Sequence, residues 1–163
     1  MPYFTHRKLV DWIDEAGKTL GYVVKSEKRR KTHGKIFQID SMWFNDQQTL
    51  FAFFEAETRW EMNHIIGHLT CCTDYALQEN VRPLFILVFL ENDADHCIRL
   101  RKTWAWLTRP SLLPQVLRIQ CLPIYMKSNE KRSGLHVRTI TQKAFAQKID
   151  ELITSIGVKT ITN

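Results

Sequence analysis

The sequence predicts a single α/β domain, built on a mixed central sheet of about five strands with helices on its flanks. Segments with apolar residues at helical spacing alternate along the chain with short apolar runs typical of strands. One of these runs, Val81–Leu90, is continuously apolar, as in a strand that is covered on both faces. The 163 residues, 44% of them hydrophobic, can bury one such core, and no linker or repeat divides them. We therefore expect one domain over residues 1–163.

The first half of the chain opens with a helix. Apolar residues at helical spacing predict it over Thr5–Thr19, with Thr5 as its cap and Gly21 as its end. Three strands are expected after it, separated by a charged turn that starts at Lys28 and by the turn residues Asn45-Asp46. The ranges of these strands are Gly21–Glu27, Lys35–Phe44 and Thr49–Glu57.

The second half continues the alternation of helices and strands. A helix is predicted over Arg59–Gln78, because Thr58 and Glu61 form a capping-box pattern before an apolar stripe. Pro123 places a later strand, Leu117–Tyr125, at the edge of the sheet. The other expected elements are the strand Val81–Leu90, the helix Asp93–Leu107, a basic turn over Lys127–Gly134, a short strand over Leu135–Ile140 and the helix Thr141–Ile156.

Basic residues gather around the first predicted turn. The chain carries 23 Lys and Arg against 17 Asp and Glu, for a net charge of +6, which permits a nucleic-acid partner. Such a cluster can neutralise phosphates, so the turn could follow a nucleic-acid backbone; it could equally be a solvated hairpin tip. The residues concerned are Lys25, Lys28, Arg29, Arg30, Lys31 and Lys35.

The remaining composition points to a reducing cytoplasm. The four cysteines show no CxxC spacing, so neither a zinc knuckle nor a disulfide framework is indicated. The N-terminal residues contain no apolar signal region, and no run of about 20 apolar residues could span a bilayer. We expect a cytoplasmic protein without membrane contact.

Three carboxylates follow the apolar parts of two neighbouring predicted strands. Glu55 and Glu57 are two residues apart on one strand, so they share a face, and Asp40 of the preceding strand can lie beside them. Buried carboxylates are costly unless positive charge meets them. The arrangement therefore predicts an oxygen-ligand site for a divalent metal.

Asp40, followed on the next strand by Glu55-Ala56-Glu57, resembles the PD-(D/E)xK nuclease superfamily, which has the restriction-endonuclease-like fold. In that pattern an acidic residue on one strand precedes (D/E)-x-K on the next. Here Ile39 stands where the motif has Pro, and Glu57 stands where it has Lys. Some members carry Glu-x-Glu and are active, whereas others have lost catalytic residues and only bind. The resemblance covers Arg7 to Leu90.

The resemblance implies a restriction-endonuclease-like fold and the hydrolysis of phosphodiester bonds, with DNA rather than RNA as the substrate. Asp40 and Glu55 would hold Mg²⁺ or Mn²⁺, with the Ala56 carbonyl as a third oxygen, and Glu57 would accept a proton or hold a second cation. Many enzymes of this fold act as homodimers. The alternatives are a catalytically degenerate nucleic-acid-binding or regulatory protein of the same fold and a protein-interaction domain.

Two further positions are candidates for auxiliary roles. The resemblance implies that an acidic residue of the first helix, Glu15 or Asp14, can reach the metal; a solvated helix face is the alternative. His64 and His68 lie one turn apart on the helix after the acidic strand, where they could bind a metal, contact a phosphate or simply pack.

Overall fold

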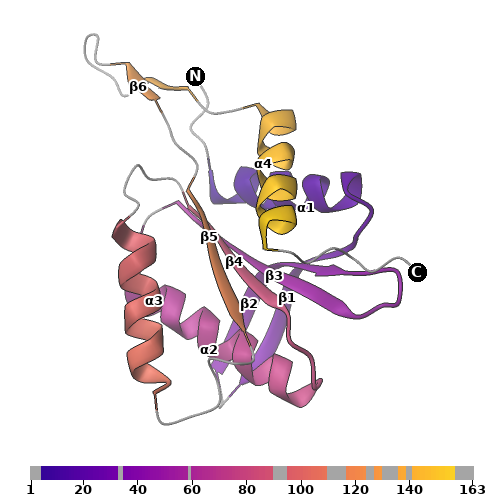
Figure 1. Ribbon diagram of the computed structural model, residues 1–163, viewed down its shortest axis with the longest axis vertical. Coiled ribbons are helices and arrows are strands. Elements are labelled where there is room, and N and C mark those ends of the chain that lie inside the picture. Colours follow the sequence, from indigo (N-terminus) through magenta and orange to yellow (C-terminus); the bar gives the residue numbers. More distant parts are fainter. Residues whose placement is uncertain are drawn as a thin grey trace.

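The core of the molecule is a five-stranded mixed sheet with the order β1-β2-β3-β4-β5. The computed structural model describes residues 5–32, 35–58, 60–89, 95–109, 117–123, 127–129, 136–138 and 141–156. Strands β1 to β3 form an antiparallel meander, whereas β3, β4 and β5 run parallel to one another (Figure 1). The prediction of a mixed α/β sheet is confirmed. The strands are β1 (Val23–Thr32), β2 (Lys35–Phe44), β3 (Leu50–Glu57), β4 (Leu84–Phe89) and β5 (Arg118–Pro123).

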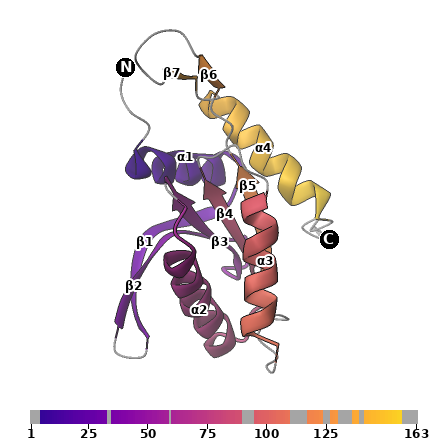
Figure 2. The same ribbon diagram turned by 90° about the vertical axis from the view of Figure 1, so that its left-hand side faces the viewer.

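Helices cover both faces of this sheet. Helices α1 and α4 pack on one face and α2 and α3 on the other (Figure 2). Thr5 caps α1 and Thr141 caps α4, each by accepting a backbone N–H in the first turn, at 3.2 and 3.1 Å. The helices are α1 (His6–Thr19), α2 (Met62–Gln78), α3 (Asp95–Leu107) and α4 (Gln142–Ser155). None of the described helices is long and apolar enough to cross a membrane.

Helix α1 lies very close to the sheet. A Cβ atom added to Gly17 would sit 2.6 Å from Cε2 of Trp43 on β2 and 2.6 Å from Cγ2 of Val24 on β1. Trp43 is fully buried and stacks between Tyr22 and Phe54. Glycine at position 17 therefore permits the close contact between α1 and the sheet.

Two sequence predictions fail at the ends of elements. The charged turn expected from Lys28 onward is instead part of β1, which pairs in register as far as Thr32 opposite Lys35. An outer strand tolerates charged residues because solvent can reach its side chains. Helix α2 begins at Met62, with Glu61 as a cap that makes no side-chain hydrogen bond, so the predicted capping box does not form.

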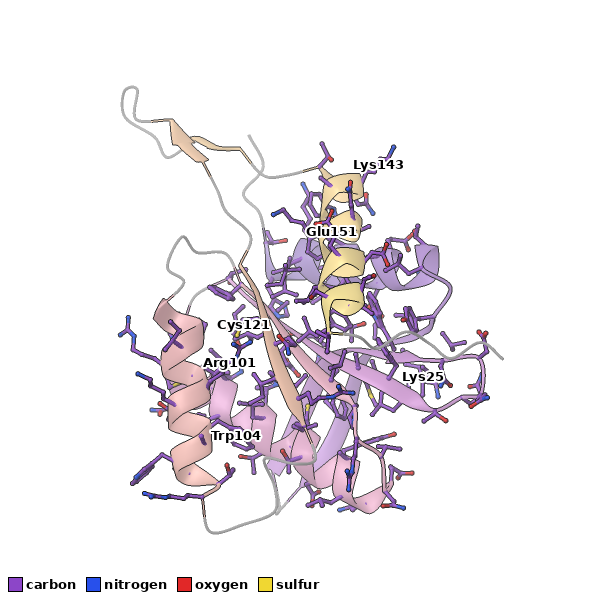
Figure 3. The ribbon with its side chains drawn as sticks, viewed as in Figure 1. Lys25, Arg101, Trp104, Cys121, Lys143 and Glu151 are labelled. Atoms are coloured by element: carbon purple, nitrogen blue, oxygen red, sulfur yellow. The ribbon has the colours of Figure 1, made fainter. Side chains whose placement is uncertain are left out.

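The C-terminal part adds a short hairpin and an edge strand. Strands β6 (Lys127–Asn129) and β7 (His136–Arg138) pair antiparallel, where the sequence predicted a turn followed by a strand. Strand β5 is at the sheet edge, as Pro123 predicted. Arg101 of α3 donates hydrogen bonds to the Ile119 carbonyl and the Gln120 side chain of β5, at 3.4 and 3.2 Å (Figure 3). Cys121 of β5 is disulfide-bonded, although the spacing of the cysteines indicated no disulfide framework.

Candidate active site

The predicted acidic residues meet where β2 and β3 lie side by side. The antiparallel register pairs Ser41 with Phe54, so Asp40 and Glu55 are the next residues on the two strands and point to one face. The Asp40 carboxylate accepts a hydrogen bond from the backbone N–H of Ala56, with 2.9 Å between Oδ2 and N. All three carboxylates are buried: Asp40 is 5% exposed, Glu55 2% and Glu57 8%.

Each of these carboxylates meets a histidine. His6 Nε2 lies 3.1 Å from Asp40 Oδ2, and His64 Nδ1 lies 2.9 Å from Glu57 Oε1. His68 Nδ1 approaches Glu55 Oε2 to 2.9 Å, as a close electrostatic contact without the geometry of a directed hydrogen bond. These imidazole groups are polar partners of the kind that buried carboxylates require.

The histidines of α2 also contact each other. His64 Nε2 and His68 Nε2 are 2.9 Å apart, so one of these nitrogens donates and the other accepts. When both rings are neutral and His64 Nδ1 donates to Glu57, the His64 Nε2 atom must accept from His68. The Nδ1 atom of His68 then carries no proton on the side that faces Glu55. This distribution matches a protonated Glu55.

The pKa values of the three carboxylates are shifted in different directions. Burial and then the charge of Asp40 raise the pKa of Glu55 well above its ordinary value. Burial acts in the same direction on Asp40, but the hydrogen bonds from His6 and Ala56 outweigh it and leave the pKa of Asp40 lowered. Burial raises the pKa of Glu57 even though His64 opposes it. Burial and the neighbouring His64 lower the pKa of His68 to about 4.

The donor chemistry of the cluster suits a divalent cation. Among the described residues Glu55 Oε1 is buried without a hydrogen-bond partner, and Asp40 is close enough to raise the pKa of Glu55. A cation would satisfy that oxygen and relieve the repulsion between the two carboxylates. Within the described part of the chain, no three or more His, Cys, Asp or Glu side chains are already arranged as a metal site.

The auxiliary candidates differ in whether the structure places them beside the three carboxylates. Glu15 is exposed and pairs with Lys18 at 2.7 Å, so the structure does not bring it to the carboxylates. Asp14 is buried and accepts hydrogen bonds from Ser41, at 2.6 Å, and from Ser26. His64, in contrast, belongs to the cluster. The sequence did not identify His6, which reaches Asp40 from the first residue of α1.

The basic candidates lie along the β1–β2 hairpin, whose end reaches beyond the sheet beside α2 (Figure 2). The exposed Lys25 places its Nζ 4.4 Å from the centre of the Phe44 ring. For the other candidates the structure describes the strand backbone and not the side chains. These residues are Lys28, Arg29, Arg30 and Lys31 on β1 and Lys35 on β2.

No protein-family model matches the chain, and no curated protein matches it either.

Proposed function

We propose that this protein is a metal-dependent nuclease that hydrolyses phosphodiester bonds in DNA. One observation carries the proposal: Asp40, Glu55 and Glu57 from adjacent strands are gathered and buried on one face of the sheet. Burying three carboxylates together is costly, and a site for cationic and phosphate chemistry gives that cost a purpose.

The order of the elements supports the same proposal. A helix and a meander of three strands precede a second helix and a parallel strand, and the acidic residues lie on the second and third strands. The PD-(D/E)xK superfamily places its acidic residues in this order. The proposal therefore includes a restriction-endonuclease-like fold and membership of the Glu-x-Glu variant of that superfamily.

Each residue of the cluster has a role in the proposed reaction. Asp40 and Glu55 would hold Mg²⁺ or Mn²⁺, and the backbone carbonyl of Ala56 is the proposed third oxygen. The metal would lower the pKa of a water molecule and offset the charge on the phosphate. Glu57 and His64 form a hydrogen-bonded pair at 2.9 Å, and His64 is half exposed. This pair can accept the proton of the attacking water in place of the missing lysine.

The surface of the β1–β2 hairpin supports DNA as the partner. Its basic residues lie along two long antiparallel strands, which is a shape that can follow a phosphate backbone. A homodimer would place one carboxylate cluster on each strand of a DNA duplex.

A second candidate function is nucleic-acid binding or regulation without catalysis. It is favoured by the histidine beside each carboxylate, because hydrogen bonds and close contacts with imidazole groups could stabilise the cluster without any metal. The replacement of the motif lysine by Glu57 points the same way. In this case the protein would bind DNA but hydrolyse nothing.

Cleavage of duplex DNA distinguishes the two candidates. We expect the native protein to nick supercoiled plasmid with Mg²⁺ or Mn²⁺, and Asp40→Asn to lose both cleavage and the heat of metal binding in a calorimetric titration. Asp46→Asn is the matched control, because Asp46 is an exposed carboxylate in the turn after β2. A native protein that binds DNA, binds neither ion at millimolar concentration and cuts nothing would establish the second candidate.

A further inference from the structure

A separate cavity lies at the other end of the sheet from the carboxylates. It has a volume of about 370 Å³, within the range of small-molecule pockets. The turn after β2, the turn after α2 and the first residues of β4 and β5 form its walls. The lining residues that matter here are Asn45, Phe51, Asn80, Arg82, Leu84 and Arg118.

This cavity is distant from the candidate active site. Leu84 at the start of β4 lines the cavity, whereas Phe89 at the end of β4 pairs with Glu57. Five residues of a strand span roughly 17 Å at about 3.3 Å per residue. A ligand of small-molecule size in the cavity would therefore not touch the carboxylates.

Backbone hydrogen bonds hold the walls of the cavity in place. The side-chain oxygen of Asn45 accepts the N–H groups of Gln47 and Thr49, at 3.0 and 2.9 Å. On the opposite wall Asn80 adopts a left-handed conformation, with φ of 51°, and the Val81 N–H donates to the Ala76 carbonyl at 3.0 Å. Both turns are thus fixed before a ligand arrives, which lowers the entropy cost of binding.

The cavity is positively charged. Arg82 and Arg118 line it, and its lining contains no carboxylate among the residues that the structure describes. In the same described ranges, neither arginine forms an ion pair or a side-chain hydrogen bond. Arg118 pairs with Leu84 across β4 and β5, so these two side chains share a face of the sheet. Arg82 lies two residues before Leu84, outside the strand, and lines the same cavity as Arg118. Two guanidinium groups at one cavity can bind a phosphate dianion through paired hydrogen bonds.

We propose that this cavity binds a small phosphate monoester with a compact aromatic body, the class to which nucleoside monophosphates belong. The phosphate lies between Arg82 and Arg118, and the aromatic body lies against the apolar floor of Phe51 and Leu84. Asn45 and Asn80 stand at the sides and offer polar groups to the body of the ligand. This site is independent of the proposed nuclease activity and uses none of its residues.

Calorimetric titration of the full chain with AMP tests the proposal, with adenosine as the ligand that lacks the phosphate. We expect AMP to bind, adenosine to bind at least tenfold more weakly, and both Arg82→Gln and Arg118→Gln to weaken AMP binding roughly tenfold. Arg109→Gln is the matched control, because Arg109 is an exposed arginine outside the cavity, and it should bind AMP like the native protein. Thermal unfolding checks that each variant is folded.

Two results would overturn the proposal. One is the absence of AMP binding at millimolar concentration in the folded native protein. The other is AMP binding that both cavity variants retain. Plasmid cleavage by Arg118→Gln should equal that of the native protein, so failure of this proposal and failure of the nuclease proposal are separate outcomes.

Discussion

The two ends of the parallel strands carry opposite charges in opposite environments. At the end of β3, where Asp40 of the antiparallel strand β2 lies alongside, three carboxylates are buried and each lies beside a histidine. At the beginnings of β4 and β5, two arginines are exposed around a cavity. Buried charge requires partners from the protein itself, whereas water solvates exposed charge at little cost. Burial of the three carboxylates therefore lowers the stability of the fold. The exposed arginines at the other end lower it little and remain available to a ligand.

The rate of plasmid cleavage should differ most between a substitution of Glu55 at the acidic end and one of Arg118 at the basic end. Glu55→Gln keeps the size of the side chain but removes a proposed metal ligand, so we expect plasmid cleavage to fall by at least about 10³-fold. Arg118→Gln at the basic end should leave cleavage unchanged. The measurement is the initial rate of nicking in Mg²⁺ and in Mn²⁺. Equal rates for native protein and Glu55→Gln would remove Glu55 from the reaction.

Substitution of His64 tests whether the histidines take part in chemistry or only neutralise charge. His64→Gln removes the proton acceptor paired with Glu57, and we expect kcat to fall roughly 10²-fold with little change in KM. The pH profile of kcat should change with it, which a purely structural role would not cause. Glu61→Gln, at an exposed position before the same helix, is the control.

The Glu57→Lys variant also tests whether the Glu57–His64 pair accepts the proton. It restores the common motif but removes the partner of His64. Lower activity is expected if the Glu57–His64 pair accepts the proton. An inactive native protein that gains weak Mg²⁺-dependent cleavage through Glu57→Lys would instead identify a degenerate nuclease.

The hairpin charges should have a smaller effect, on DNA affinity. Changing Arg29, Arg30 and Lys31 to Ala should reduce the slope of log affinity against log salt by roughly 0.9 for each lost phosphate contact. A control that removes the same charge elsewhere uses Lys102, Arg109 and Lys143, which are exposed on or beside α3 and α4. If both triple variants show the same slope, the hairpin is only a solvated surface.

The smallest effect is on stability without metal. The folded-state pKa of Glu55 is raised above the ordinary Glu pKa of 4.5. Its contribution to the free energy of unfolding is therefore fully present below pH 4.5 and is lost as the pH rises through the folded-state pKa. Glu55→Gln removes this loss, and the variant should exceed the native Tm by a few degrees at pH 7, since about 1 kcal/mol shifts Tm by roughly 2–4 °C. At pH 4 the two proteins should unfold at nearly equal temperatures. A Tm advantage that does not grow with pH would contradict the assignment.

The acidic end could be predicted from sequence because its signal is local. The two-residue alternation places Glu55 and Glu57 on one face, and a short turn brings Asp40 beside them. His6 could not be found in this way, because it lies 34 positions before Asp40 and reaches it only through the packing of α1. The arginine cavity has the same difficulty, since Arg82, just before β4, and Arg118 of β5 line one cavity only because these two parallel strands pair. The extent of β1 was missed because charged residues favour turns on average, whereas backbone pairing determines the end of this strand.

Helix α1 connects the close contact at Gly17 to the buried carboxylates. Its last turns rest on Trp43 without room for a methyl group, and its first residue, His6, touches Asp40. The two points are eleven residues apart, or roughly 16 Å along a helix. A side chain at position 17 would push the C-terminal part of α1 away from the sheet. We expect the resulting tilt of the helix to move the His6 imidazole at its N-terminus. We therefore expect the packing at Gly17 to influence the position of His6 at the other end of the helix.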